Sequence, residues 1–240
     1  ASPQGKFIYK ALLCPVVCAK RKDVAMLQKH SLRSGCKDVF HAFMVQSATF
    51  ESELEIPCIK QESKLPSKLI AFSKALSKTD FESWIHFYGD DVTFERIWNQ
   101  PFKYLPVLKR YQGVISPDFS LYRDMPLVMQ YWNVYRSRAI AVWLQHNNIP
   151  VIANVRWGDQ RTYSICCAGV PKNATISIGS HGCIRSQQER EYFIQGLSHV
   201  VKTLSPKTIL VYGTVPNEVF GIYRDAGIQI HQFDSDCAVA

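Results

Sequence analysis

Carboxylates, an arginine, a histidine, serines and a tyrosine follow short apolar runs of this 240-residue sequence. The residues that we single out at these positions are Ser116, Asp118, Arg156, Asp159, Ser180, His181 and Tyr212. Carboxylate and imidazole groups transfer protons or act as nucleophiles, and the planar guanidinium binds phosphate or carboxylate through paired hydrogen bonds. If these side chains converge, they supply the acid, base and anion-binding groups of a hydrolase or a transferase.

Asp118 and Asp159 are the candidate catalytic carboxylates. Asp118 follows Pro117, whose fixed φ stiffens the turn, so its carboxylate is a candidate general base, nucleophile or cation ligand. An aspartate at such a turn also commonly binds neighbouring backbone N–H groups, and that structural role stays open. Arg156 is the candidate anion-binding residue, and Asp159 either orients it through an ion pair or holds a divalent cation.

His181 is the third candidate catalytic residue. It follows Ser180 at the end of a predicted strand, where an imidazole can transfer protons near neutral pH. A nucleophilic pair with Cys183 is a weaker alternative, because residues two apart converge only if the turn between them cooperates. Ser116, Ser180 and Tyr212 are predicted to bind substrate together with Arg156.

Alternating strand and helix patterns predict parallel β/α units and hence an α/β fold. The predicted strands span residues 68–72, 84–88, 113–116, 150–155, 175–179, 208–212 and 228–233, and the predicted long helices span residues 127–147 and 187–204. Polar residues follow almost every strand rather than gathering at one point, which favours a compact or incomplete TIM-like barrel over an open doubly wound sheet. In either arrangement the loops after the strands share one face, where ligands bind.

Residues just before the helix predicted at 127–147 are typical of a helix N-terminus. Asp124 is a suitable N-cap residue, and Pro126 suits the first helical turn. We therefore expect the Asp124 side chain to bind the first free backbone N–H groups of this helix.

Positive charge is concentrated near the start of the sequence. The chain has 28 Lys and Arg against 20 Asp and Glu, a net charge of +8, and eight basic residues but one acid lie between Lys6 and Lys37. We predict a basic arm at residues 1–34 and a single α/β domain at residues 35–240. Such an arm attracts nucleic acid or another polyanion, although a solvated terminus has the same composition.

The eight cysteines do not form a recognisable metal motif. Those at positions 14, 18, 36 and 58 lack the second tight pair of a zinc ribbon, so we assign no metal ligand. Cys166 and Cys167 are expected to be buried free thiols in an apolar stretch. Reduced thiols fit the cytoplasm, and no apolar run approaches the roughly 18 residues of a membrane span, so we expect a cytoplasmic protein with no membrane partner.

Six short segments resemble the signature motifs of a domain-of-unknown-function family found in bacteria, their phages and other mobile elements. They are CKDVF at 36–40, FERIW at 94–98, SPDFSLY at 116–122, VRWGD at 155–159, SHGC at 180–183 and VYG at 211–213. The resemblance covers roughly residues 35–236 and implies one intracellular α/β domain in a mobile-element context. Its motif positions include Asp118, Arg156, Asp159 and His181. It implies no particular reaction.

These observations lead to two functional hypotheses. The first is an enzyme, a hydrolase or transferase of a phage or mobile element, that acts on nucleic acid or a nucleotide-like anion, with a divalent cation as an open cofactor. The second is a non-catalytic protein that binds nucleic acid or blocks a host protein. A small-molecule sensor is a third, weaker alternative. The common nucleotide-binding, zinc-protease and serine-hydrolase motifs are absent from the sequence.

Overall fold

A computed structural model of the chain describes residues 38, 40–184 and 186–235. The chain divides into two units, Ala1–Gln46 and Ser47–Ala240. The described part of the first unit contains the short 3-10 helix η1 (Ala42–Val45). The basic arm predicted at residues 1–34 lies outside the described residues.

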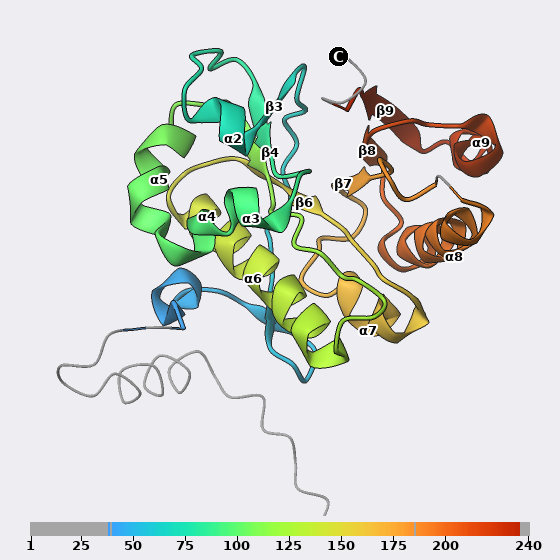
Figure 1. Ribbon diagram of the computed structural model, residues 1–240, viewed down its shortest axis with the longest axis horizontal. Coiled ribbons are helices and arrows are strands. Elements are labelled where there is room, and N and C mark those ends of the chain that lie inside the picture. The colour runs from blue at the N-terminus through green and yellow to red at the C-terminus, as the bar shows by residue number, and fades with distance from the viewer. Residues whose placement is uncertain (1–37, 39, 185, 236–240) are drawn as a thin grey trace, which may run out of the picture. The chain divides into compact units, whose positions relative to one another are not determined.

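Seven parallel strands form the main sheet of the second unit (Figure 1). They are β3 (Leu69–Ala71), β4 (Trp84–His86), β5 (Gly113–Ile115), β6 (Val151–Asn154), β7 (Thr175–Gly179), β8 (Thr208–Tyr212) and β9 (Gln229–Phe233). Their spatial order is their chain order, so the sheet has no point at which the strand order reverses, as a doubly wound sheet has. The sheet curls into a half-barrel, and the prediction of an incomplete barrel of parallel β/α units is confirmed.

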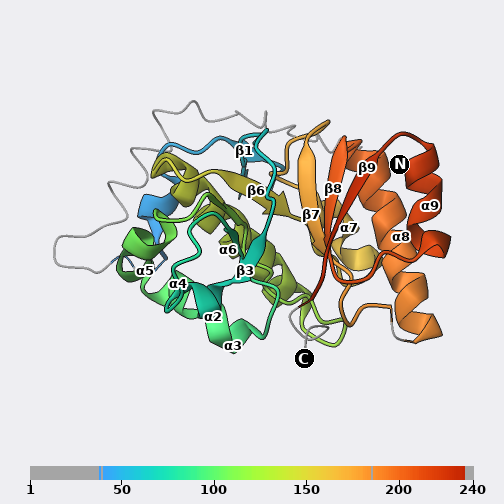
Figure 2. The same cartoon turned by 90° about the horizontal axis from the view of Figure 1, so that it is seen from above.

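Helices flank the curled sheet. They are α2 (Phe72–Ala75), α3 (Asp91–Phe94), α4 (Arg96–Asn99), α5 (Pro101–Leu108), α6 (Leu127–His146), α7 (Tyr163–Cys166), α8 (Gln187–Leu204) and α9 (Asn217–Asp225). Seen from above in Figure 2, α8 and α9 lie beside the strands β7, β8 and β9, and α6 packs against β6. None of the helices in the described residues has an apolar stretch of the length that a membrane crossing requires.

A small hairpin and a short 3-10 helix complete the second unit. Strands β1 (Phe50–Glu51) and β2 (Ile56–Pro57) pair antiparallel, and β2 packs against α6. The 3-10 helix η2 (Gln160–Thr162) leads directly into α7.

Burial explains why the central strands form where they do. Every residue of β4, β5, β6 and β8 is buried, as expected for parallel strands that are covered on both faces. Strand β9, at one edge of the sheet, contains only exposed and half-buried residues. The apolar runs in the sequence are therefore continuous for the central strands and broken at this edge.

The two long helices begin in different ways. Helix α8 starts with a capping box, in which the Ser186 side chain accepts from the Glu189 N–H while the Glu189 carboxylate accepts from the Ser186 N–H. Helix α6 starts after Pro126 and has no side-chain cap, so the prediction that Asp124 caps this helix is wrong. The ring of a proline disfavours helical backbone at the preceding residue, so the helix cannot extend back toward Asp124.

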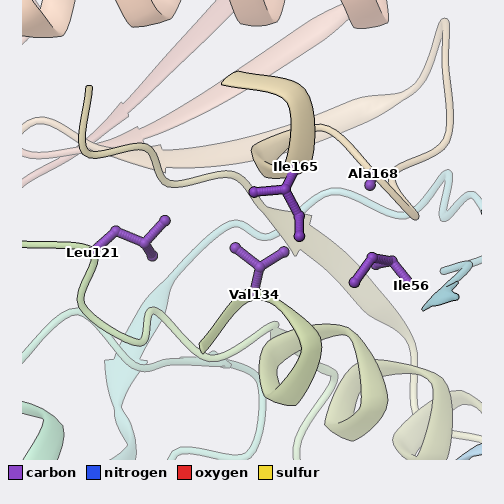
Figure 3. Packing of buried hydrophobic residues seen from close by; sticks show 5 residues of the cluster. All are labelled: Ile56, Leu121, Val134, Ile165 and Ala168. Atoms are coloured by element: carbon purple, nitrogen blue, oxygen red, sulfur yellow. The ribbon is translucent and has the colours of Figure 1, made fainter. Parts of the chain in front are cut away.

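An apolar cluster fixes the loop after β5. Leu121 from that loop, Val134 of α6 and Ile165 of α7 are buried together, with Ile56 and Ala168 completing the cluster (Figure 3). Because these residues come from four separate segments, Leu121 anchors the loop that carries Asp118 in the core.

A glycine on α8 allows close approach of the loop after β6. A Cβ atom on Gly196 would overlap the indole ring of Trp157, so the ring lies directly on the helix backbone. The Trp157 ring also contacts the Phe193 ring, with 5.3 Å between the ring centroids. The absence of a side chain at position 196 therefore sets how closely this loop and α8 pack.

Replacing Gly196 with alanine is expected to lower the free energy of unfolding by about 2 kcal/mol, because the added methyl group overpacks the interface with Trp157. The matched control is Gly221→Ala on α9, where a Cβ meets the side chain of Asn217 at 3.1 Å and no ring. Alanine favours a helix over glycine by up to about 1 kcal/mol, so this control is expected to be neutral or slightly stabilising. Urea denaturation measures both, and equal effects would contradict this account of the Trp157 packing.

Candidate functional site

A pocket of about 420 Å³ opens at the carboxyl ends of β5, β6 and β7. The residues that line it are Asp118, Leu121, Tyr122, Arg123 and Asp124 after β5, Val155, Arg156, Trp157 and Gly158 after β6, Gly179, Gly182 and Cys183 at and after the end of β7, and Glu189, Tyr192 and Phe193 from α8. The carboxyl ends of parallel strands are where α/β folds bind ligands, and this volume suits a small molecule.

Asp118 and Arg156 form a short ion pair in this pocket. The Arg156 Nη1 atom lies 2.5 Å from Asp118 Oδ2, and the Asn154 side-chain amide donates to Asp118 Oδ1 at 2.7 Å. The Asp118 side chain is only 6% exposed, whereas 29% of the Arg156 side chain is exposed. The carboxylate therefore has a partner on each oxygen, and the guanidinium reaches the pocket surface.

Burial and charge act on Asp118 in opposite directions. Burial raises the pKa of Asp118, while the Arg156 guanidinium and the Asn154 amide oppose that rise. Asp118 in turn raises the pKa of Arg156. A buried carboxylate of raised pKa is more basic than one in water, which suits a general base.

A second layer of hydrogen bonds fixes the Asn154 amide. The Tyr88 hydroxyl donates to Asn154 Oδ1 at 2.8 Å and lies 2.7 Å from Ser177 Oγ. Burial raises the pKa of Tyr88 well above its ordinary value, so this hydroxyl remains a donor. With its oxygen occupied in this way, the Asn154 amide has its N–H group directed at Asp118.

Three of the four predicted substrate-binding residues, all except Arg156, support the ends of the strands. Ser116 Oγ accepts from the Asn154 N–H at 2.8 Å, and Ser180 Oγ donates to the Thr214 carbonyl at 2.7 Å. The Tyr212 ring stacks on the Tyr88 ring, with 4.7 Å between the centroids and 12° between the planes. All three predicted residues are buried and lie outside the pocket lining, so their contacts here are with protein.

Asp159 and His181 also lie outside the pocket lining. Asp159 pairs with Arg161 at 2.8 Å and accepts from the Arg161 N–H at 3.0 Å, which caps η2. Hydrogen bonding to Arg161 lowers the pKa of Asp159. The predicted ion pair between Asp159 and Arg156 is not formed, because Arg156 turns to Asp118. The side chain of His181 is exposed.

Aromatic side chains and further charges form the walls of the pocket. Tyr122, Trp157, Tyr192 and Phe193 are aromatic, and the Arg123 guanidinium lies 4.3 Å from the centroid of the Tyr192 ring. The charged residues of the lining that the structure describes are three acids and two arginines: Asp118, Asp124, Glu189, Arg123 and Arg156. Burial raises the pKa of the Cys183 thiol, which also lines the pocket. The pocket is therefore aromatic and of mixed charge.

Two kinds of site residue are not among those predicted from the sequence. Asn154 gives a usable signal, since it is a polar residue that ends the apolar run of β6. Tyr192 and Phe193 give none, because the apolar pattern of α8 cannot show that its first turns overhang a pocket. Their place depends on how α8 packs against the loop of Trp157.

Comparisons with known proteins give a family and two phage relatives. The model of a family described as Domain of unknown function (DUF4417) matches residues 48–234. The chain is 33% identical over 165 residues to the Gene 1 protein of Mycobacterium phage D29, covering 68% of this chain and 61% of the relative. It is 34% identical over 171 residues to the Gene 1 protein of Mycobacterium phage L5, covering 69% of this chain and 74% of the relative. No solved structure matches.

Replacing Arg156 with methionine is expected to lower the free energy of unfolding by about 3 kcal/mol at pH 7, because it leaves the buried Asp118 carboxylate without its cation. The loss should shrink as the pH falls toward 4. Without Arg156 the pKa of Asp118 rises further, and a carboxyl with a higher pKa in the folded state than in the unfolded state loses stability as the pH increases.

Denaturation at several pH values measures this change. The matched control is Arg161→Met, which breaks the exposed pair with Asp159 and should leave the free energy of unfolding close to that of the wild type. A loss in Arg156→Met that does not vary with pH would contradict an unpaired Asp118 as its cause.

Proposed function

The chain belongs to the DUF4417 family of domains of unknown function, and from its pocket we propose that it is an enzyme, a hydrolase or transferase, that acts on a nucleotide-like ligand. The observation that carries this proposal is the buried Asp118 carboxylate, which is fixed by Arg156 and Asn154 in a pocket of small-molecule size. Such a group is costly to bury and is positioned on both oxygens, as a reacting carboxylate needs to be.

Asp118 is the proposed general base. Each carboxylate oxygen has more than one lone pair, so Asp118 can accept a proton from water or from a ligand hydroxyl while it keeps its bonds to Arg156 and Asn154. A guanidinium has five N–H donors, and the bond to Asp118 uses one of them. The donors that remain on Arg156 are proposed to bind a negatively charged group of the ligand or of the transition state.

The walls of the pocket suggest the class of ligand. Trp157, Tyr192 and Tyr122 offer ring faces on which a planar base can stack, and Arg123 adds a second cation beside Tyr192. The three carboxylates of the lining make a polyanionic strand a poor occupant, because each further phosphate would meet like charge. A single nucleotide, with one planar ring and few charges, fits these properties better than a polymer.

Replacing Asp118 with asparagine is expected to reduce turnover at least 100-fold, because the amide keeps the shape of the carboxylate but cannot accept the proton. The substrate to assay is first selected by the shift in melting temperature that a panel of nucleosides and nucleotides causes in the wild-type chain. Phosphate release and product chromatography then measure turnover in both proteins.

Two further variants separate this role from the predicted roles of Asp159 and His181. Asp159→Asn and His181→Asn alter residues outside the pocket lining and should retain turnover within about threefold of the wild type. Loss of turnover in His181→Asn with an unchanged melting temperature would instead make His181 the acid or base. Full turnover in Asp118→Asn would overturn the proposed catalysis.

Nucleic-acid binding is a second candidate function, favoured by the basic stretch between Lys6 and Lys37. This function needs no catalysis and would not use the pocket. Lysine and arginine side chains that neutralise phosphates release counterions, so the affinity falls steeply as salt increases.

If this stretch binds nucleic acid, the triple variant K20A/R21A/K22A should weaken binding to a DNA duplex. The slope of log K against log salt should also become less steep, by the amount expected for the loss of up to about three phosphate contacts. Fluorescence anisotropy at several salt concentrations measures both. The matched control K74A/K78A/K109A removes the same charge from exposed positions of the second unit and should bind as the wild type does. Binding that is independent of salt would exclude electrostatic recognition.

A further inference from the structure

Two adjacent cysteines and a histidine meet where α7 packs against α8. Cys166 ends α7, Cys167 follows it, and His199 lies on α8. One ligand atom from each of the three residues lies within 4.8 Å of the other two, and both cysteines are buried. None of the three lines the pocket of Asp118. We call them the Cys–Cys–His cluster.

The spacing of the two sulfur atoms matches that of a metal site. Cys166 Sγ and Cys167 Sγ are 3.7 Å apart. Two thiolates on a tetrahedral zinc ion, each at about 2.3 Å from the metal, are about 3.8 Å apart. We propose that the Cys–Cys–His cluster binds one thiophilic divalent metal ion of the Zn²⁺ class.

His199 has the environment of a metal-binding histidine. Its Nε2 atom lies 2.9 Å from the Tyr163 carbonyl oxygen, which can only accept, so Nε2 carries a proton and Nδ1 is the nitrogen that can bind a metal ion. The Tyr163 ring stacks on the imidazole, with 4.8 Å between the centroids and 17° between the planes. Histidine ligands usually hold their second ring nitrogen through a carbonyl or carboxylate in this way.

A buried cation lies beside the two cysteines. The buried Arg138 guanidinium donates to the carbonyls of Cys166 at 2.8 Å, Ala168 at 3.1 Å and Asn154 at 2.9 Å, which are neutral groups.

Metal binding leaves the net charge of the cluster unchanged. The ion displaces one proton from each thiol, and a divalent cation with two thiolates and a neutral imidazole has no net charge. Such a centre adds no charge to a buried region that already holds Arg138. The cluster contains no carboxylate, and sulfur and nitrogen donors select zinc-like ions over Mg²⁺ or Ca²⁺. Three protein donors leave one tetrahedral position for water.

Cobalt titration of the reduced 240-residue chain tests this proposal. Cysteines 14, 18, 36 and 237, which lie outside the described residues, are first replaced by serine so that they cannot compete. We expect one Co²⁺ per chain, a sulfur-to-cobalt charge-transfer band and the visible absorption of a tetrahedral ion, all reversed by Zn²⁺. Zn²⁺ should also raise the melting temperature.

In this background, Cys167→Ala and His199→Gln should each weaken Co²⁺ binding by at least about tenfold. His199 is only half-buried, so its variant tests the cluster even if Cys167→Ala does not fold. The matched controls are Cys58→Ser and Cys183→Ser, which alter the other described free thiols and should bind Co²⁺ as the parent does. A parent without the charge-transfer band, or a His199→Gln variant with unchanged affinity, would overturn the proposal.

Discussion

The buried ion pair between Asp118 and Arg156 requires a fixed strand register and a hydrogen-bond partner for each carboxylate oxygen. The two residues are 38 positions apart in the sequence, and they meet because β5 and β6 pair in parallel, with Val114 opposite Val151. Removing a carboxylate from water costs several kcal/mol unless its oxygens are occupied. Asn154 occupies one of these oxygens, and the backbone N–H of Asn154 is itself bonded to Ser116. The pair therefore depends on the register of two central strands.

The architecture could be predicted from the sequence because the fold depends on local patterns. The runs at 175–179 and 208–212 and the helix at 187–204 have the bounds that the structure gives, since each is a continuous apolar or amphipathic segment with clear ends. Helix α6 begins at the predicted residue, Leu127, and only its cap differs from the prediction, because the restriction that Pro126 places on the preceding residue outweighs the capping tendency of Asp124.

The site was harder to predict than the fold. Asp118 and Arg156 were found because polar residues after buried strands are conspicuous. The sequence could not show that Arg156 pairs with Asp118 rather than with Asp159, since that choice depends on the direction in which each loop turns. The Cys–Cys–His cluster could not be predicted from the sequence for a similar reason. His199 lies a helix away from the two cysteines, and no short spacing connects them.

The order of the strands also decides which parts of the molecule can open locally without consequence for the pocket. Strands β5, β6 and β7 are the third, fourth and fifth of seven, so two strands lie between the pocket and each edge of the half-barrel. Edge strands and exposed segments exchange their amide hydrogens first, because they break the fewest contacts when they open. Fraying at β3 or at the partly exposed β9 therefore leaves the pairing of β5 with β6 in place. An open sheet of this kind keeps the loops of its pocket in its most protected region even though it lacks the closed ring of a complete barrel.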